Sequence, residues 1–196
     1  MKNPALPMQP AIAFALIAVF VAFAATAFAQ PGRPSYAGTA LTALQPLTES
    51  EAQRLAFMRE EEKLARDVYQ EMYKKWNLTV FQNISEAEQA HFDAIGKLLA
   101  RYGAKDPALN TAPGVYSDPV LIALYNDLMA KGAQSAQEAL AAGTLIETRD
   151  IADLEAAVAG TTKLDLKRVY TNLLNGSFNH LDAFAGMCEL AGPAGN

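Results

Sequence analysis

The stretch that decides the fold is FQNISEAEQAHFDAIGKLLARY, residues 81–102. One line of residues along it, spaced alternately three and four apart, consists of Phe81, Ile84, Glu88, His91, Ile95, Leu98 and Tyr102. This spacing predicts a helix that buries one face in a bundle. Glu88 and His91 interrupt that face with a carboxylate and an imidazole that point the same way. Because burial of an unpaired carboxylate is costly, the face needs a counter-charge, and a metal ion is one solution.

Three further segments repeat the pattern. The expected helices cover Thr48–Trp76, Ser135–Ala159 and Thr162–Leu190. Each has an apolar face that is interrupted by metal-ligand residue types, namely Glu62 on the first, Glu147 and Asp150 on the second, and His180 on the third. At roughly 100° per residue, the neighbours of Glu62 in the run of three glutamates turn away from this face. We therefore expect Glu62, and not Glu60 or Glu61, to be buried.

The connections between these helices predict the topology. A turn of three residues, Asn77–Thr79, joins the first two helices and implies an antiparallel hairpin. The long link Ala104–Ser117 follows, and Asp118 with Pro119 then starts a short helix that runs to Lys131. Alternation with the period of a strand persists nowhere in the sequence. The predicted fold is all-α: an antiparallel four-helix bundle with a long crossover that carries a short extra helix between bundle helices 2 and 3.

The N-terminal end has the features of an export signal. Lys2 precedes an apolar run from Ala11 to Ala29, and the run ends in a small-x-small motif before Gln30. An uncleaved membrane anchor is the alternative, because the run is close to the roughly 20 residues that span a bilayer. We expect an exported protein, periplasmic or extracellular, with a signal peptide (1–29), a flexible linker (30–47), the bundle domain (48–190) and a C-terminal tail (191–196).

Charge and cysteine content narrow the set of partners. The formal net charge is −5, and no cluster of Lys and Arg stands out, which argues against nucleic acid and, after signal cleavage, against a membrane surface. The single cysteine, Cys188, cannot form an internal disulfide, so the core, a metal or both must stabilise the exported chain. The sequence leaves the oligomeric state open, a dimer included.

The six inward polar residues form a candidate metal centre. They are Glu62, Glu88, His91, Glu147, Asp150 and His180, and they include both histidines of the chain. Carboxylate and imidazole together suit iron, manganese or zinc, whereas calcium and magnesium sites rarely use imidazole. We expect a transition metal, iron first, with manganese or zinc as alternatives.

The spacing and the helix order resemble the ferritin-like family of di-iron and di-manganese carboxylate proteins. More narrowly, the chain resembles an exported prokaryotic ferritin-like domain family of unknown function, over Thr48 to about Leu190. The motifs that carry this resemblance are Glu62-Lys-Leu-Ala-Arg-Asp-Val-Tyr69, Glu88-Gln-Ala-His91 and Gly176-Ser-Phe-Asn-His180-Leu. The resemblance implies an exported metal-binding protein with an oxidase-type, peroxidase-type or iron-handling role, and it assigns no catalytic residue.

The resemblance also gives the inward residues their places. It makes Glu62 and Glu147 the single carboxylates of the first and third bundle helices, and Glu88 with His91 the intact pair of the second. On the fourth helix, Ser177 stands where the family has the Glu of its second Glu-x-x-His. Asp150, one turn beyond Glu147, is the candidate replacement for that missing carboxylate.

Other interpretations of the same residues remain. The inward acids and histidines could form a hydrogen-bonded network without metal, in a non-enzymatic bundle with a structural or stress-related binding role; a metal store or carrier is a third function. Whether the chain is an enzyme stays open. Glu88 would be the third residue of a capping box if its helix began at Ser85. Tyr69 and Tyr170 are expected to be core aromatics, with a role beside a metal as the weaker alternative.

Overall fold

The computed structural model describes residues 44–191 and contains five helices and no strand within them. The helices are α1 (Glu49–Trp76), α2 (Thr79–Tyr102), α3 (Pro119–Gly132), α4 (Ala136–Ala159) and α5 (Leu164–Ala191). The predicted signal peptide and most of the predicted linker and tail lie outside the described residues. No helix in residues 44–191 combines the length and apolar character that crossing a membrane requires.

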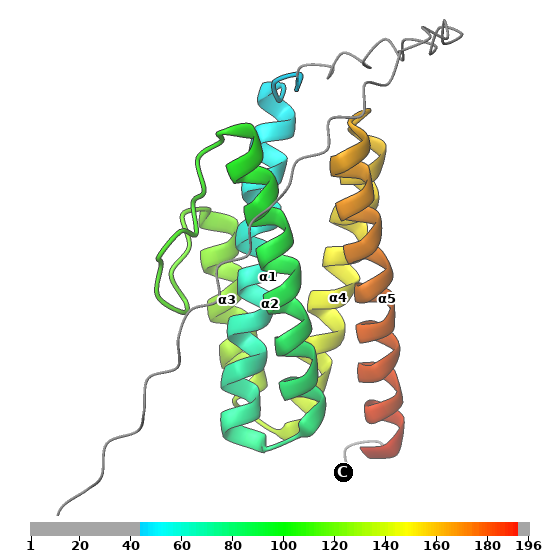
Figure 1. Ribbon diagram of the computed structural model, residues 1–196. Helices are drawn as coiled ribbons and strands as arrows, with labels where there is room; N and C mark the ends of the chain where they lie inside the picture. The colour runs from blue at the N-terminus through cyan, green and yellow to red at the C-terminus, as the bar shows by residue number, and fades with distance from the viewer. Residues whose placement is uncertain (1–43, 192–196) are drawn as a thin grey trace, which may run out of the picture. The chain divides into compact units, whose positions relative to one another are not determined.

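Figure 1 shows two helix hairpins packed side by side. α1 pairs with α2 and α4 pairs with α5, while α1 also packs on α4 and α2 on α5. Consequently α2 and α4 occupy one diagonal of the bundle, and α1 and α5 occupy the other. α3 packs on α1 and α4 within the long crossover. The predicted all-α antiparallel four-helix bundle, with a short extra helix in its crossover, is confirmed.

Local signals set the helix ends. Thr48 closes a reciprocal capping box with Glu51, and Asp118 accepts hydrogen bonds from the backbone N–H groups at the start of α3. Asn77 caps the C-terminus of α1 and Gly103 that of α2, both in the left-handed region with φ of 51° and 62°. Because α2 begins at Thr79, Ser85 lies inside the helix and its hydroxyl donates to the Gln82 carbonyl. The capping-box interpretation of Glu88 is therefore wrong.

The core in the described residues consists of two apolar clusters with a polar layer between them. One cluster centres on Tyr69, Phe81 and Phe184, and the other on Met58 and Ile95. Along each of the four bundle helices, the inward polar residues fall between the residues of one cluster and those of the other. The candidate site therefore lies at mid-height in the bundle, with packed apolar side chains above and below it.

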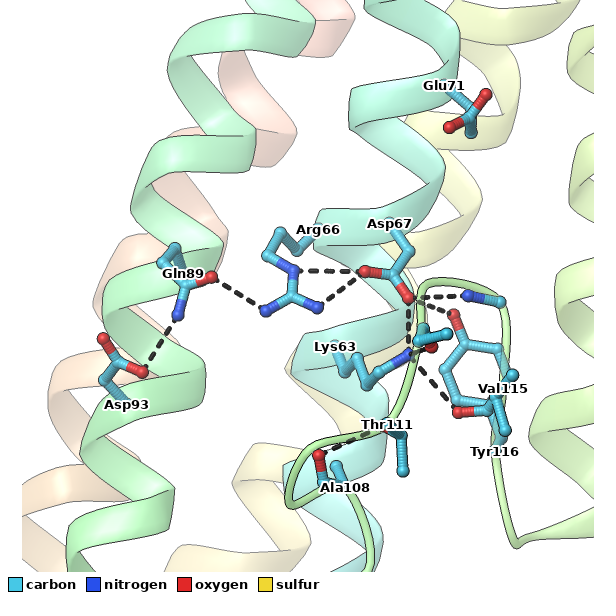
Figure 2. Close-up of polar contacts among 12 residues, drawn as sticks. Lys63, Arg66, Asp67, Glu71, Gln89, Asp93, Ala108, Thr111, Val115 and Tyr116 are labelled. Atoms are coloured by element: carbon cyan, nitrogen blue, oxygen red, sulfur yellow. Dashed lines mark hydrogen bonds and ion pairs between the residues drawn. The ribbon is translucent and has the colours of Figure 1, made fainter.

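The crossover is fixed to α1 by a buried charge network that Figure 2 shows. The Lys63 ammonium is 2.7 Å from Asp67 Oδ2 and donates to the carbonyls of Ala112 and Val115. Asp67 also accepts from Gly114 N and from the Tyr116 hydroxyl, at 2.9 and 3.0 Å. All three Lys63 protons have acceptors, which makes burial of this ion pair tolerable.

The prediction that Glu62 alone would be buried among its neighbours is wrong. Glu60, Glu61 and Glu62 are all at most 3% exposed. Glu60 does lie on the far side of α1, but the crossover covers it there, and its carboxylate accepts from Ser117 Oγ and Asp118 N at 2.9 and 3.1 Å. Helical periodicity shows which way a side chain points, but it does not show what a distant loop will cover.

Candidate metal centre

Each bundle helix contributes to one buried polar layer. Four of the six predicted residues are buried acids: Glu62, Glu88, Glu147 and Asp150, each at most 5% exposed. The side chains of the two histidines, His91 and His180, are 13% and 11% exposed. The structure therefore brings all six predicted residues to the same height in the bundle. Glu88, His91 and His180 each offer a ligand atom, and these three atoms lie within 4.8 Å of one another.

Glu88 lies between the two imidazoles. His91 Nδ1 donates to Glu88 Oε2 at 2.9 Å, and His180 Nδ1 lies 2.8 Å from Glu88 Oε1. The two rings stack with their centroids 5.4 Å apart. Each oxygen of one carboxylate thus faces a different histidine. A carboxylate shared between two cations would have this arrangement.

Glu62 and Glu147 repeat this arrangement on either side. Glu62 Oε2 is 3.3 Å from His91 Nδ1, and Glu147 Oε2 is 3.5 Å from His180 Nδ1. The layer therefore contains two similar groups, each with one glutamate and one histidine, joined through Glu88. This pseudo-symmetry follows from the packing of one hairpin against the other.

Tyr69 orients Glu147 from the apolar side of the layer. The Tyr69 hydroxyl donates to Glu147 Oε1 at 2.6 Å, and its ring is fully buried beside Phe184. The hydrogen bond leaves Glu147 Oε2 turned toward His180. Tyr69 is thus both a core aromatic, as predicted, and the residue that sets the direction of one candidate ligand.

Asp150 contacts Ser177, the residue that stands where the ferritin-like pattern would have a glutamate. The Ser177 hydroxyl, which is fully buried, lies 2.6 Å from Asp150 Oδ2 and 3.0 Å from the Leu173 carbonyl. Asp150 Oδ1 is buried and has no hydrogen-bond partner within the described residues. The serine hydroxyl therefore holds one oxygen of Asp150 and leaves the other unpaired.

Glu61 is a buried acid that the sequence reasoning missed. Its Oε1 accepts from Arg149 Nε at 3.3 Å, and the same nitrogen lies 3.7 Å from Asp153 Oδ2. Burial, together with the charges of Asp150 and Asp153, raises the pKa of Glu61 well above its usual value. The i, i+3 spacing of Glu147, Asp150 and Asp153 could have signalled an acidic stripe on α4 that faces α1.

A glycine lets α5 approach the first histidine. A Cβ atom at Gly176 would lie 2.6 Å from His91 Nε2, well inside van der Waals contact. The Nδ1 atom of the same ring faces Glu62 and Glu88. Gly176 therefore lets the His91 ring lie against the α5 backbone, and this position directs Nδ1 to the centre.

The pKa values describe how the layer distributes charge when no cation is present. Burial works to raise the pKa of Glu88, but the two histidines outweigh it and lower the value to about 2. Burial works to lower the histidine pKa values, but Glu62 and Glu88 raise that of His91 to about 11, and Glu147 and Glu88 raise that of His180 to about 9. The metal-free layer is thus a glutamate anion between two imidazolium groups.

The remaining acids carry the opposite shift. Burial raises the pKa values of Glu62 and Asp150 well above their usual range, and the nearby Glu88 charge adds to both shifts. Burial and the Glu88 charge also raise the pKa of Glu147 to about 7, against the lowering effect of His180 and Tyr69. These shifts favour the neutral form of Glu62 and Asp150, so without a metal ion protons supply the counter-charge that these buried acids need.

The unpaired atoms of this layer test whether the residues fit a metal. Among residues 44–191, the buried donor atoms of the layer without a hydrogen-bond partner are Glu62 Oε1, Glu62 Oε2, Glu147 Oε2, Asp150 Oδ1 and His180 Nδ1. Although His180 Nδ1 is close to Glu88, its N–H is not aligned with that oxygen. Three of these atoms, Glu62 Oε2, Glu147 Oε2 and His180 Nδ1, still have an ion-pair contact at 3.3, 3.5 and 2.8 Å. Glu62 Oε1 and Asp150 Oδ1 have none, and each such buried group costs about 1–3 kcal/mol, which needs a reason. Carboxylate oxygens and imidazole nitrogens are metal-ligand atoms, and the donor set fits a transition metal.

Comparison with other proteins places the chain among close relatives. The uncharacterized protein MJ0754 of Methanocaldococcus jannaschii is 50% identical over 143 residues, which cover 73% of this chain and 77% of that protein. The crystal structure of the hypothetical protein MJ0754 aligns with a TM-score of 0.75 and 47% identity, over 78% of this chain and 87% of that one.

A more distant structure shares the fold alone. The crystal structure of a DUF305 fragment from Deinococcus radiodurans aligns with a TM-score of 0.57 and 13% identity, over 74% of this chain and 99% of that one. Residues 51–194 match the family described as uncharacterized protein domain DUF2202. The chain therefore belongs to the DUF2202 family.

Proposed function

We propose that this chain is a ferritin-like protein that binds a transition metal, iron first, at the centre of its bundle. The observation that carries the proposal is a set of five buried oxygen and nitrogen atoms without a hydrogen bond, contributed by α1, α4 and α5 around Glu88 of α2. Two of them, Glu62 Oε1 and Asp150 Oδ1, also lack an ion-pair contact, and a core without a cation gains nothing from leaving them so. The mixture of carboxylate and imidazole favours iron, with manganese and zinc as competitors, over calcium or magnesium.

The pseudo-symmetry of the layer suggests where cations would bind. Glu62 with His91 would hold one cation and Glu147 with His180 a second, and Glu88 would serve both. The two oxygens of Glu88 already face different histidines at 2.9 and 2.8 Å. A divalent cation in each position would replace the charge that the two imidazolium protons supply in the metal-free chain.

Iron bound in this layer would supply redox chemistry toward O₂ or peroxide. The residues of the chain prepare that chemistry by holding the ligands and excluding water. Tyr69 fixes Glu147 through its 2.6 Å hydrogen bond, and the two apolar clusters enclose the layer from both ends of the bundle. Because the histidines ligate only as neutral rings, each gives up a proton when a cation binds.

Export is part of the proposal. Residues 1–29 have the charge, apolar run and Ala-x-Ala end of a signal peptide. We infer that the mature chain begins at Gln30 and acts outside the cytoplasm. N-terminal sequencing of the protein from its native host tests this, since a chain that retains its first 29 residues would support a membrane anchor instead.

A non-enzymatic bundle without metal is the second candidate. Ser177 in place of a glutamate favours it, and so do the short contacts of Glu88 with both histidines, because a charged network of this kind can exist without metal. Under this alternative, Glu88→Gln and His91→Asn change stability and have no effect on metal content. A metal store or carrier is separated from an oxidase by whether loaded ferrous iron turns over with peroxide or stays bound.

Metal analysis decides between these functions. The chain is purified without chelator, its metal content is measured, and the metal-free form is titrated with Fe²⁺ under anaerobic conditions. We expect at least one equivalent of metal and a higher melting temperature on loading. Glu62→Gln should lower the affinity, whereas Glu86→Gln, an exposed acid on α2, should leave it unchanged. A chain with less than about a tenth of an equivalent and no thermal stabilisation would refute the proposal.

A further inference from the structure

The two histidine-bearing helices differ at one position. On α2, Glu88 lies three residues before His91 and its carboxylate contacts that histidine. On α5, Ser177 lies three residues before His180, so the layer lacks the second glutamate that its pseudo-symmetry calls for. A serine side chain is too short to reach a cation between the helices in place of a glutamate. The structure nevertheless places a carboxylate at this position.

That carboxylate belongs to Asp150 of α4. Its Oδ2 is 2.6 Å from Ser177 Oγ, so the serine hydroxyl and the aspartate together extend from the α5 backbone toward the layer. Asp150 is 5% exposed, and its Oδ1 is among the unpaired buried atoms of the described chain.

Asp150 and Glu88 come from opposite sides of the bundle. α2 and α4 occupy one diagonal, because each packs against both α1 and α5. Glu88 thus reaches the layer from one end of this diagonal and Asp150 from the other. We propose that Asp150, held by the Ser177 hydroxyl, is the second carboxylate shared between two cations, and that the chain binds two divalent cations as a result. This inference rests on the proposed metal function.

The proposal assigns different roles to the two residues. Asp150 would be a ligand of both cations, so its removal should leave enough ligands and negative charge for one cation only. Ser177 is a positioning residue that acts through Asp150, so its removal should weaken binding of the second cation without abolishing it. Loss of such a supporting partner typically lowers metal affinity about 10–100-fold.

The test is a Co²⁺ titration of the metal-free full chain, followed by calorimetry and by the absorption spectrum of the bound ion. We expect two equivalents for the unmodified chain, one for Asp150→Asn, and two for Ser177→Ala, with the second bound about tenfold or more weakly. Moving the carboxylate back to α5 with the double variant Asp150→Ala, Ser177→Glu should restore two equivalents. Glu155→Gln, an exposed acid on α4, should match the unmodified chain.

Melting temperatures of the metal-free variants separate a ligand from a structural residue. The amide that Asp150→Asn introduces would keep the Ser177 hydrogen bond through its oxygen and would carry no charge among the other buried acids of the layer. This variant should therefore melt at the same temperature as the unmodified chain or higher. A lower melting temperature would indicate a structural role and overturn the inference.

The outcomes of the titration also separate this inference from the proposed function. Binding of two cations by Asp150→Asn with unchanged constants, or of one cation by the unmodified chain, overturns the inference and leaves the metal function standing. A chain that binds no Co²⁺ and no Fe²⁺ overturns both.

Discussion

Replacement of Gly176 by alanine should displace His91 and weaken the metal centre. A Cβ atom at this position would be 2.6 Å from His91 Nε2 and 2.8 Å from Cε1. An ordinary contact is about 3.5 Å, so the ring must move by about 0.9 Å. That movement also displaces Nδ1 of the same ring, which lies 2.9 Å from Glu88 Oε2. We expect Co²⁺ affinity to fall about tenfold or more.

Gly186→Ala is the matched control on the same helix. A Cβ atom there meets no atom of the described chain within 4 Å. Alanine stabilises a helix interior by about 1 kcal/mol relative to glycine, and this gain is common to both variants. The clash adds about 1–3 kcal/mol of overpacking at Gly176 only.

The assay compares the two variants by thermal unfolding without metal and by Co²⁺ titration. In a domain of this size 1 kcal/mol corresponds to about 2–4 °C, so Gly176→Ala should melt roughly 2–12 °C below Gly186→Ala. If the two variants match in melting temperature and in Co²⁺ affinity, the close approach of α5 to His91 is refuted.

Three further predictions concern the ion pair under the crossover, the first helix cap and the protons of the centre. Lys63→Met removes the ammonium from Asp67 Oδ2 and from two carbonyls of the crossover, while Arg66 stays paired with Asp67 Oδ1, so the change should cost about 1–3 kcal/mol in urea unfolding. The absence of a measurable cost would contradict this. Burial works to raise the pKa of Glu51, but hydrogen bonds from Thr161 and Thr48 outweigh it and lower the pKa in the folded state. The stabilisation that Glu51 contributes is therefore complete above its pKa in the unfolded chain and is lost as the pH falls through its pKa in the folded chain. The difference in unfolding free energy between the unmodified chain and Glu51→Gln should therefore shrink in acid, and a constant difference would argue against the folded-state hydrogen bonds. Because the pKa values of His91 and His180 rise to about 11 and about 9, Co²⁺ binding should release protons, and the affinity should increase from roughly pH 6 to pH 8. Calorimetry in two buffers of different ionisation enthalpy measures the number of protons released. Co²⁺ binding without proton release would show that the ligands are other residues.

The helices and their order could be predicted from the sequence because each depends on local signals. The capping box at Thr48, the Asp118-Pro119 start and the apolar spacing of three and four all act within a few residues. The same spacing predicted that Glu88 and His91 share one face of their helix. The short turn after the first helix and the long crossover after the second predicted which helices pair. These features need no knowledge of the tertiary structure.

The rest depended on contacts between segments that are distant in the sequence. The burial of Glu60 requires the crossover to fold across the far face of α1, and helical periodicity carries no information about that. The hydrogen bond between Ser177 and Asp150 joins α5 to α4 across 27 residues. Sequence spacing identified Asp150 as a candidate, but only the packing of the two helices shows what holds it.

The position of the polar layer between two apolar clusters has a consequence for dynamics. Each bundle helix contributes to both clusters, so the two ends of the bundle are held together by hydrophobic packing whether or not a cation is bound. The middle turns have acids and imidazoles as their inward side chains, and of the four helices only α1 has the crossover fixed to it at that height in the described chain. Without a cation, amide hydrogen exchange should therefore be fastest in the middle turns of the bundle helices, while the turns that carry the two apolar clusters stay protected. A cation would reverse this order by tying four helices together at their midpoints.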